Sequence, residues 1–157
     1  MARQPREEPG REDGHVSAED HQLDDRGIEF GVHGLLVDAE LEAADVEMVV
    51  LSGYMRILTP WFVRRWKGRL LNIHPSLLPD FPGAHAHRDA LAAGATVTGC
   101  TVHLVDEGVD SGPILAQMEV EVRPEDDEGA LQERVKVVEH VVYPDVLDRI
   151  CSGLISL

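Results

Sequence analysis

Residues 70–83 constrain the fold of this chain more than any other stretch. They read Leu-Leu-Asn-Ile-His-Pro-Ser-Leu-Leu-Pro-Asp-Phe-Pro-Gly. The first five residues predict a buried strand, in which Asn72 and His74 share one face and the apolar residues between them share the other. Pro75 ends regular pairing because it has no backbone N–H. We therefore expect an amide and an imidazole side by side at the carboxyl end of a strand, with a rigid loop behind them.

The position of this polar pair admits two interpretations. Open α/β sheets bind ligands just outside the carboxyl ends of their strands, which favours a functional site. A lone Asn-x-His motif, however, is more often a strand end with a structural histidine. The rest of the chain decides between them.

The residues before this stretch complete a strand–helix–strand unit. Residues 46–52 are rich in β-branched side chains and predict a buried strand that stops at Gly53. Thr59 followed by Pro60 is typical of a helix start, and Gly68 is typical of a helix end. A helix that joins two strands in this way is the βαβ unit of an α/β fold.

The residues after the proline-rich stretch supply the remaining elements. We predict a short helix over residues 88–93 and strands over residues 97–105 and 114–122. An acidic, glycine-rich turn at residues 106–112 separates the two strands. A long helix should follow from residue 124 to Gly153, because apolar residues recur there at spacings of three or four.

The N-terminal segment differs in composition from the rest. Residues 1–45 contain 13 acidic and 4 basic residues, and the only large apolar residues among the first 27 are Met1, Val16 and Leu23. Such a segment buries too little apolar surface to offset its loss of conformational entropy. We expect a poorly ordered segment over residues 1–45, with a short strand at 28–32 and a weak helix at 35–44, and one domain over residues 46–157.

Charge and cysteine content exclude several classes of protein. A net charge of −15 disfavours nucleic-acid partners and anionic membrane surfaces. The charged start of the chain resembles no secretory signal, and no apolar run is long enough to span a membrane. Cys100 and Cys151 are too few for a disulfide framework, so a reducing cytoplasm is the expected location. His85, His87 and His103 lack a matching cysteine or carboxylate ligand, so we predict no metal site.

Several motifs occur together in a characteristic order over residues 45–150. They are residues 51–58 (LSGYMRIL), 72–79 (NIHPSLLP), 81–83 (FPG), 99–103 (GCTVH) and 106–113 (DEGVDSGP). In this order they resemble the folate-dependent formyltransferases, most closely the branch that formylates glycinamide ribonucleotide. The resemblance implies an open, mostly parallel, doubly wound sheet in which the first βαβ portion is incomplete.

The resemblance also implies an activity, substrates and site residues. It implies transfer of a formyl group from 10-formyltetrahydrofolate to the amine of glycinamide ribonucleotide in purine biosynthesis, without a metal. It assigns catalysis to Asn72, His74 and Asp110. It assigns folate binding to Met55, Arg56, Ile57, Leu58, Asn72, Asp106, Glu107, Gly108, Val109 and Asp110. It assigns ribonucleotide binding to Lys136, Val137, Val138 and Glu139.

The chemistry of the three catalytic candidates agrees with these roles. Attack of an amine on a formyl carbon places negative charge on the formyl oxygen, and Asn72 could donate a hydrogen bond to it. A donor of this kind contributes about 2.7–4 kcal/mol in measured enzymes. Histidine as a residue type can gain or lose a proton under physiological conditions, so His74 could donate a proton or stabilise the oxyanion. Asp110 would favour protonated His74 through its charge, and could accept the proton of the amine.

One part of the family pattern is missing from this sequence. The family begins with a strand and a glycine-rich loop that binds the substrate phosphate, and residues 31–34 are a poor substitute. Three hypotheses remain: a glycinamide ribonucleotide formyltransferase with an atypical or truncated N-terminus, an enzyme with another acceptor such as a formyltetrahydrofolate deformylase, or an inactive fragment. An exposed sheet edge could bind a partner chain or allow self-association.

Overall fold

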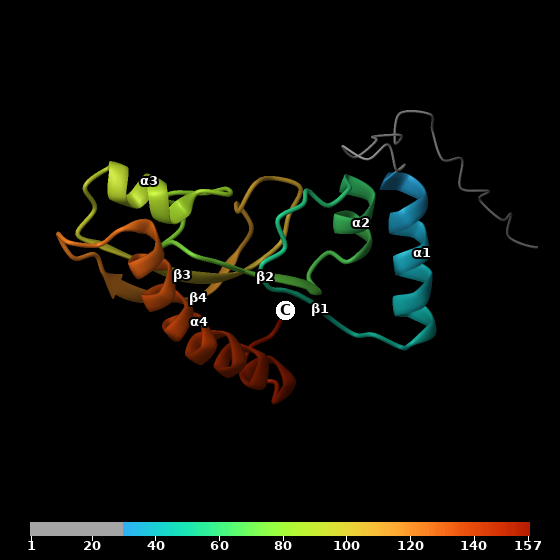
Figure 1. Ribbon diagram of the computed structural model, residues 1–157. Coiled ribbons are helices and arrows are strands. Elements are labelled where there is room, and N and C mark those ends of the chain that lie inside the picture. The colour runs from blue at the N-terminus through green and yellow to red at the C-terminus, as the bar shows by residue number, and fades with distance from the viewer. Residues whose placement is uncertain (1–29) are drawn as a thin grey trace, which may run out of the picture.

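The computed structural model describes residues 30–157 and contains one mixed four-stranded sheet (Figure 1). The strands are β1 (Val49–Leu51), β2 (Leu70–His74), β3 (Val97–Leu104) and β4 (Ile114–Glu121), and they lie side by side in that order. β1 pairs with β2 in parallel, whereas β2–β3 and β3–β4 are antiparallel. The sheet therefore changes from parallel to antiparallel at β2.

The expected α/β fold is confirmed, but the expectation of a mostly parallel sheet is wrong for the described residues. A parallel connection needs a crossover of a dozen residues or more, and the turn between β3 and β4 is shorter than that. The link from β2 to β3 stays at the carboxyl end of β2, so β3 enters the sheet from that end and runs back.

Residues 30–157 also form four helices: α1 (Phe30–Ala43), α2 (Pro60–Arg65), α3 (Ala86–Ala92) and α4 (Glu128–Cys151). The predicted helix start at Thr59 is confirmed, since its side chain accepts a hydrogen bond from the Phe62 N–H. α4 begins four residues later than expected, because Asp126 accepts a hydrogen bond from the Arg123 N–H in a turn and Asp127 caps the helix.

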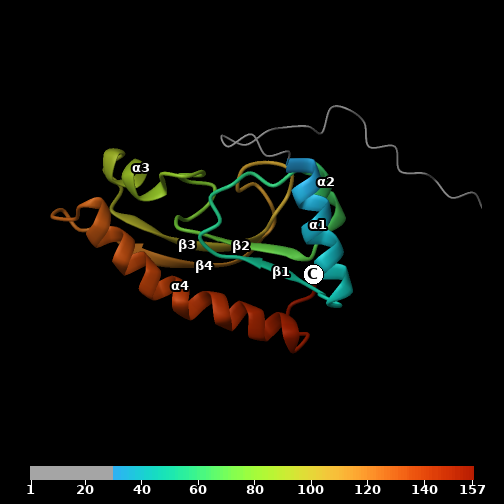
Figure 2. The same ribbon diagram turned by 45° about the vertical axis from the view of Figure 1, so that its right-hand side comes forward.

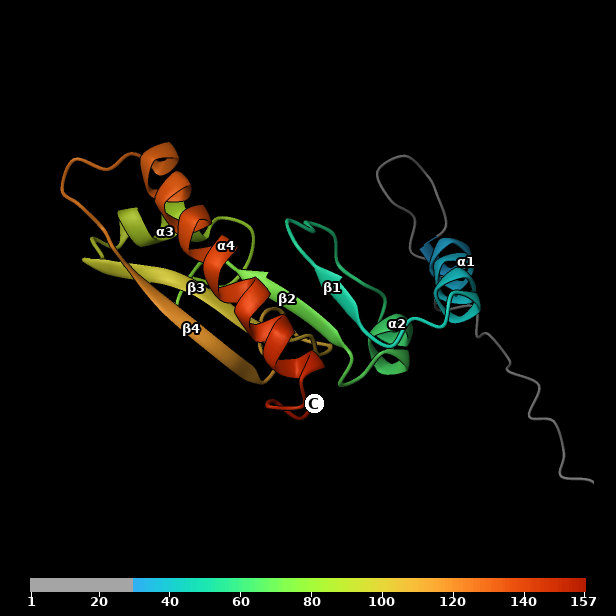
Figure 3. The same cartoon turned by 90° about the horizontal axis from the view of Figure 1, so that it is seen from below.

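The main core lies between α4 and the sheet (Figure 3). α4 contributes the predicted stripe of apolar residues, and β2, β3 and β4 contribute the facing ones. The buried members are Leu71, Ile73, Cys100, Val102, Val120, Leu131, Val135, Val142, Tyr143 and Val146. α4 thereby packs against β2, which carries the Asn72–His74 pair, and against the two strands that follow it in the sheet.

A second cluster joins α1 to α2 beside the parallel end of the sheet (Figure 2). It is centred on Trp66 and Leu70, and Val37 and Leu41 of α1 pack against it. The Trp66 Nε1–H donates to Asp38 Oδ1 at 2.7 Å. α1 is thus attached to the rest of the chain by both apolar packing and a buried hydrogen bond.

The predictions for the N-terminal segment have mixed outcomes. Residues 1–29 lie outside the described part of the chain, and with them most of the expected poorly ordered segment. From residue 30 on there is a helix, so the expected helix at 35–44 is confirmed through residue 43 and the expected short strand at 28–32 is wrong for residues 30–32. The division into a segment over 1–45 and a domain over 46–157 stays a prediction. Among the helices that the structure describes, none is long and apolar enough to cross a membrane.

Candidate active site

Asn72 and His74 lie at the carboxyl end of β2, between two other strands. On one side β1 ends beside Asn72, because Leu51 is the parallel partner of that residue. On the other side β3 places His103 opposite Asn72 and Thr101 opposite His74. The structure therefore has the predicted amide and imidazole at a strand end, with a second imidazole directly across from the amide.

His74 is only 4% exposed, and both of its ring nitrogens face oxygen atoms. Nε2 lies 2.9 Å from the carbonyl oxygen of Phe81, and Nδ1 lies 3.3 Å from Oδ2 of Asp110. A carbonyl can only accept, so Nε2 carries a proton. Only the doubly protonated ring can donate to both oxygens at once.

Asp110 is held in place by contacts with three parts of the chain. Its Oδ2 accepts a hydrogen bond from the Gly83 N–H at 2.7 Å and also faces His74. Its Oδ1 lies 3.6 Å from Nε2 of His103. The FPG motif and the acidic turn, 27 residues apart in sequence, are therefore joined at this carboxylate.

Two residues at the site have left-handed backbone conformations without being glycine. Asp110 has φ of 50° and Phe81 has φ of 54°. Such a conformation costs an ordinary residue about 1–2 kcal/mol, although aspartate tolerates it better than phenylalanine. Strained residues of this kind gather at functional sites, where the surrounding structure enforces them.

A buried hydrogen-bond network beneath His74 was not found from the sequence. The Thr101 hydroxyl donates to the carbonyl of Ser76 at 2.6 Å and accepts from the Leu78 N–H at 3.0 Å. The Gln117 amide donates to the Leu78 carbonyl and to the Thr101 hydroxyl, and Ser76 donates to the carbonyl of Asp80. β3 and β4 thus fix the proline-rich loop, which contains a cis Leu78–Pro79 peptide bond. Nothing in the sequence indicated which strands would meet this loop.

The two predicted folate-binding segments carry exposed apolar side chains. Met55 is 72% exposed, Ile57 is 85% exposed and Val109 is 64% exposed. The two segments lie on the same side of the sheet (Figure 1), and Glu107 of the acidic turn forms a 2.8 Å ion pair with Arg64 of α2. These exposed apolar side chains are available to pack against a ligand.

The other residues of these two segments have structural contacts. Leu58 packs against the second cluster, whereas Arg56 is exposed. In the acidic turn, Asp106 Oδ1 accepts hydrogen bonds from the Gly108 N–H at 3.0 Å and the Ser111 hydroxyl at 2.8 Å. This carboxylate therefore organises the turn that presents Asp110.

The four predicted ribonucleotide-binding residues on α4 differ in orientation. Val137 is 66% exposed, and Val138 packs against the main core. Lys136 forms an ion pair with Glu133 at 2.6 Å. Lys136 and Glu139 lie three residues apart, so they share one face of the helix. These two are the polar candidates of the set.

Two half-buried groups near His74 have shifted pKa values. Burial raises the pKa of Glu139, and the nearby positive charges of His140, His74 and Lys136 oppose this shift. On α3, burial lowers the pKa of His87, whose Nδ1 is buried without a hydrogen-bond partner among the described residues. α3 and α4 thus bring further titratable groups towards His74.

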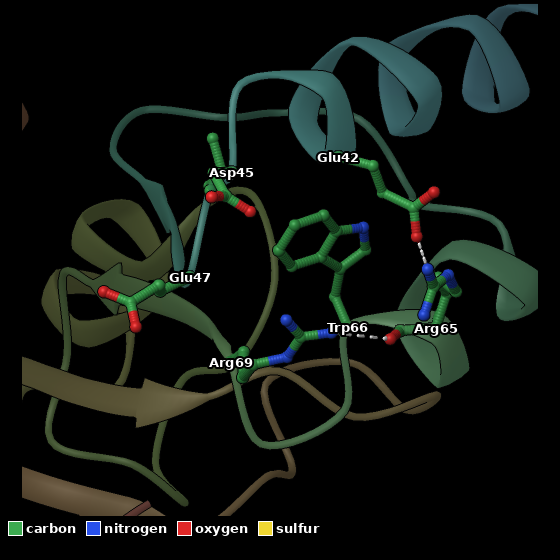
Figure 4. Close-up of a pocket in the computed structure, with 7 residues that line it drawn as sticks. Glu42, Asp45, Glu47, Arg65, Trp66 and Arg69 are labelled. Carbon is green, nitrogen blue, oxygen red and sulfur yellow. Dashed lines mark hydrogen bonds and ion pairs between the residues drawn. The ribbon is translucent and has the colours of Figure 1, made fainter.

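A polar cavity of about 560 Å³ lies away from these residues, at the amino end of β1 (Figure 4). It is lined by Glu42, Asp45, Val46, Glu47, Arg65, Trp66 and Arg69. Arg65 pairs with Glu42, and the Arg69 guanidinium lies 4.6 Å from the ring centre of Trp66. Both basic side chains of the cavity therefore contact other residues that line it, which is typical of a cavity with a structural rather than a ligand-binding role.

No cluster of three or more potential metal ligands occurs within residues 30–157. Of four histidines in this part of the chain, two contact a carboxylate and two lie at α3. His74 and His103 contact Asp110, His87 lies on α3, and His85 immediately precedes that helix.

Comparisons with known proteins give a consistent result. Residues 33–147 match the sequence model of the family described as Formyl transferase. The chain is 47% identical over 137 residues to the human trifunctional purine biosynthetic protein adenosine-3. The aligned region covers 87% of this chain and 13% of the relative. It is 56% identical over 103 residues to the phosphoribosylglycinamide formyltransferase of Mycobacterium tuberculosis, covering 66% of this chain and 48% of the relative.

The fold is also that of solved relatives. The phosphoribosylglycinamide formyltransferase of Anaplasma phagocytophilum superposes with a TM-score of 0.76 at 41% identity, over 78% of this chain and 60% of that one. The chain thus spans about half the length of the bacterial curated relative and a small part of the trifunctional protein.

Proposed function

This chain belongs to the formyltransferase family, as its motifs predicted, and from that premise we propose that it transfers a formyl group from 10-formyltetrahydrofolate to the amine of glycinamide ribonucleotide. The observation that carries the proposal is the contact between His74 and Asp110, beside Asn72 at the end of β2. Relatives named phosphoribosylglycinamide formyltransferase support the choice of acceptor.

In the proposed reaction, the three residues act on one tetrahedral intermediate. The amine nitrogen attacks the formyl carbon, a C–N bond forms, and the formyl oxygen becomes an oxyanion. Asn72 donates a hydrogen bond to this oxygen, and protonated His74 adds positive charge beside it. Asp110 accepts the proton that the amine loses. The bond from the formyl carbon to the folate nitrogen then breaks, and that nitrogen takes up a proton, giving tetrahydrofolate and the formamide of the substrate amine.

The two exposed segments would hold the folate. We propose that Met55, Arg56, Ile57 and Leu58 form one wall of its pocket. We propose that residues 106–110 form the other, and that their exposed apolar side chains become buried against the ligand. Burial of such side chains stabilises a complex by about 25 cal/mol per Å² of apolar surface.

Ribonucleotide binding would fall to α4. Lys136 can pair with an anionic group of the substrate, and Glu139 can accept hydrogen bonds from hydroxyl groups. Both cysteines are free, which fits the proposed location in a reducing cytoplasm.

Turnover with purified protein tests the proposal. The full chain is mixed with glycinamide ribonucleotide and 10-formyltetrahydrofolate, and the formylated product is measured by mass spectrometry. We expect product from the unmodified chain and a loss of at least a hundredfold in His74→Ala and Asp110→Asn. Asp145→Asn, an exposed aspartate on α4, is the matched control and should keep full activity.

Two other outcomes would redirect the proposal. Formate released without any amine would identify water as the acceptor, as in a deformylase. Calorimetry that detects no binding of 10-formyltetrahydrofolate at millimolar concentration would contradict both enzymatic hypotheses.

The outer edge of β1 is the proposed route to self-association. β1 is an edge strand of the described sheet, and Val50 is 40% exposed. Unpaired strand edges template pairing with other chains. Sedimentation over a range of concentrations would detect a dimer, and substitution of Val50 by lysine should weaken it. A monomer at all concentrations would refute this proposal.

A further inference from the structure

Asn72 can act as an oxyanion donor in only one orientation of its side-chain amide. The NH₂ group stabilises negative charge, whereas the carbonyl oxygen at the other end repels it. The two orientations differ by a half-turn and have nearly the same shape. Some neighbouring group must select between them.

We propose that His103 is a positioning residue that selects the donating orientation of the Asn72 amide. His103 lies directly opposite Asn72 in the antiparallel β2–β3 pair, where facing side chains come within contact distance. Its Nε2 lies 3.4 Å from Nδ2 of Asn72. The consequence for catalysis rests on the proposed function, but the orientation itself does not.

The backbone determines which nitrogen of His103 carries the proton. Nδ1 lies 2.9 Å from the carbonyl oxygen of Leu104, and a carbonyl accepts only from an N–H. In a neutral ring Nε2 is then an acceptor, so it takes a hydrogen bond from the NH₂ group of Asn72. The reverse orientation of Asn72 would bring two acceptors together. The Leu104 N–H is itself bonded to the carbonyl of Pro113 at 2.9 Å, which fixes this part of β3.

The surroundings of His103 favour the neutral ring. The side chain is 2% exposed, and burial lowers its pKa. The Leu104 carbonyl and the carboxylates of Asp110 and Asp106 oppose this shift, and His74 on β2 adds to it. On β4 the facing residue is Ile114, which has no charge.

The nearby Asp110 carboxylate does not change the assignment of the His103 proton to Nδ1. Oδ1 of Asp110 lies 3.6 Å from Nε2 of His103, beyond hydrogen-bond range for a shared proton. The same carboxylate already accepts from Gly83 through its other oxygen. His103 therefore accepts from Asn72 and leaves Asp110 to His74.

Nitrogen-15 NMR of the histidine-labelled full chain tests the orientation without any substrate. We expect His103 to be protonated at Nδ1 and unprotonated at Nε2 at neutral pH, and one NH₂ proton of Asn72 to show coupling across the hydrogen bond. A proton on Nε2 would overturn the proposal whether or not the chain is active.

A double-mutant cycle tests the consequence for catalysis. His103→Phe keeps the ring but removes both nitrogens, and should lower kcat by up to the roughly 10²–10³-fold that loss of an oxyanion donor costs, with little change in KM. In an Asn72→Ala background the same substitution should have almost no further effect. Additive losses would show that His103 does not act through Asn72.

A third variant separates positioning from folding. His103→Gln places an amide oxygen near the position of Nε2 and should restore part of the lost kcat. Equal losses in the Gln and Phe variants, with unchanged melting temperatures, would contradict the proposal. If the unmodified chain makes no product, the proposed function fails while the NMR result still decides the role of His103.

Discussion

Gly112 offers a sharp test of how the acidic turn positions Asp110. A Cβ atom added at this residue would lie 1.9 Å from the carbonyl oxygen of Leu104 and 2.9 Å from its carbonyl carbon. Both are backbone atoms of β3 and cannot rotate away. Gly112→Ala therefore forces the turn and the strand apart.

The size of the displacement follows from the contact. Real Cβ contacts essentially never fall below 3.0 Å, so the 1.9 Å approach must lengthen by about 1.1 Å. Overpacking of this kind typically costs about 1–3 kcal/mol of stability. Asp110 lies two residues away and should move with the turn, which would stretch its 2.7 Å bond from the Gly83 N–H beyond hydrogen-bond range. A misplacement of about 1 Å at a reacting group can cost about a hundredfold in rate.

Three measurements follow from this argument. Thermal unfolding should show the loss of stability, NMR should show the Gly83 amide resonance shifted, and turnover should fall by about a hundredfold. Gly129→Ala is the matched control, because its added Cβ meets nothing closer than 3.5 Å and it lies in α4, where alanine is favoured. An unchanged Gly83 resonance and unchanged rate in Gly112→Ala would refute the reasoning.

Three further predictions concern stability and reactivity. Hydrogen bonds from Arg134 and from the Arg123 N–H lower the pKa of Asp126 to about 2, below its ordinary value. Its contribution to stability is therefore present above about pH 4 and lost as pH falls towards 2. The melting temperature of Asp126→Asn should accordingly change less between pH 4 and pH 2 than that of the unmodified chain. An equally large fall in the melting temperature of the variant would contradict this. Leu131→Ala should cost about 2–5 kcal/mol in chemical denaturation, since the side chain is fully buried, and a loss below 1 kcal/mol would be inconsistent with that packing. Burial raises the pKa of Cys100 to about 11, so a thiol reagent should modify exposed Cys151 alone in the folded chain, and equal labelling of both would contradict the structure.

Local sequence patterns predicted the elements well where one pattern dominated. The strand over residues 70–74 has the predicted bounds, because alternation begins at Leu70 and Pro75 stops it. The helix start at Thr59 was equally clear. The start of the long helix was placed too early, since the acids that follow Pro124 form a capped turn before the first helical residue.

Arrangement in space was harder to predict from the same residues. β3 runs antiparallel to β2 because the residues that link them stay at the carboxyl end of β2. Alternation of apolar and polar residues within a strand does not show in which direction the strand runs relative to its neighbour. Thr101 and Gln117 looked like ordinary strand residues, yet they hold the loop through contacts that depend on the register of β3 and β4. His103 was considered in the sequence only as a metal ligand, because its contacts with Asn72 and Asp110 are set by pairing across strands. Its neighbour Asp110 was found only through a family motif.

The left-handed backbone at Asp110 affects both the stability of the chain and the chemistry of the proposed active site. A glycine there would adopt φ of 50° without steric cost, so replacement should relieve the strain that aspartate bears. The same replacement would remove the carboxylate that accepts from the Gly83 N–H and contacts His74, so relief of backbone strain would be set against a lost hydrogen bond. Any stabilised derivative of this chain should therefore be selected with residue 110 held fixed, so that greater stability is sought in parts of the chain away from the site.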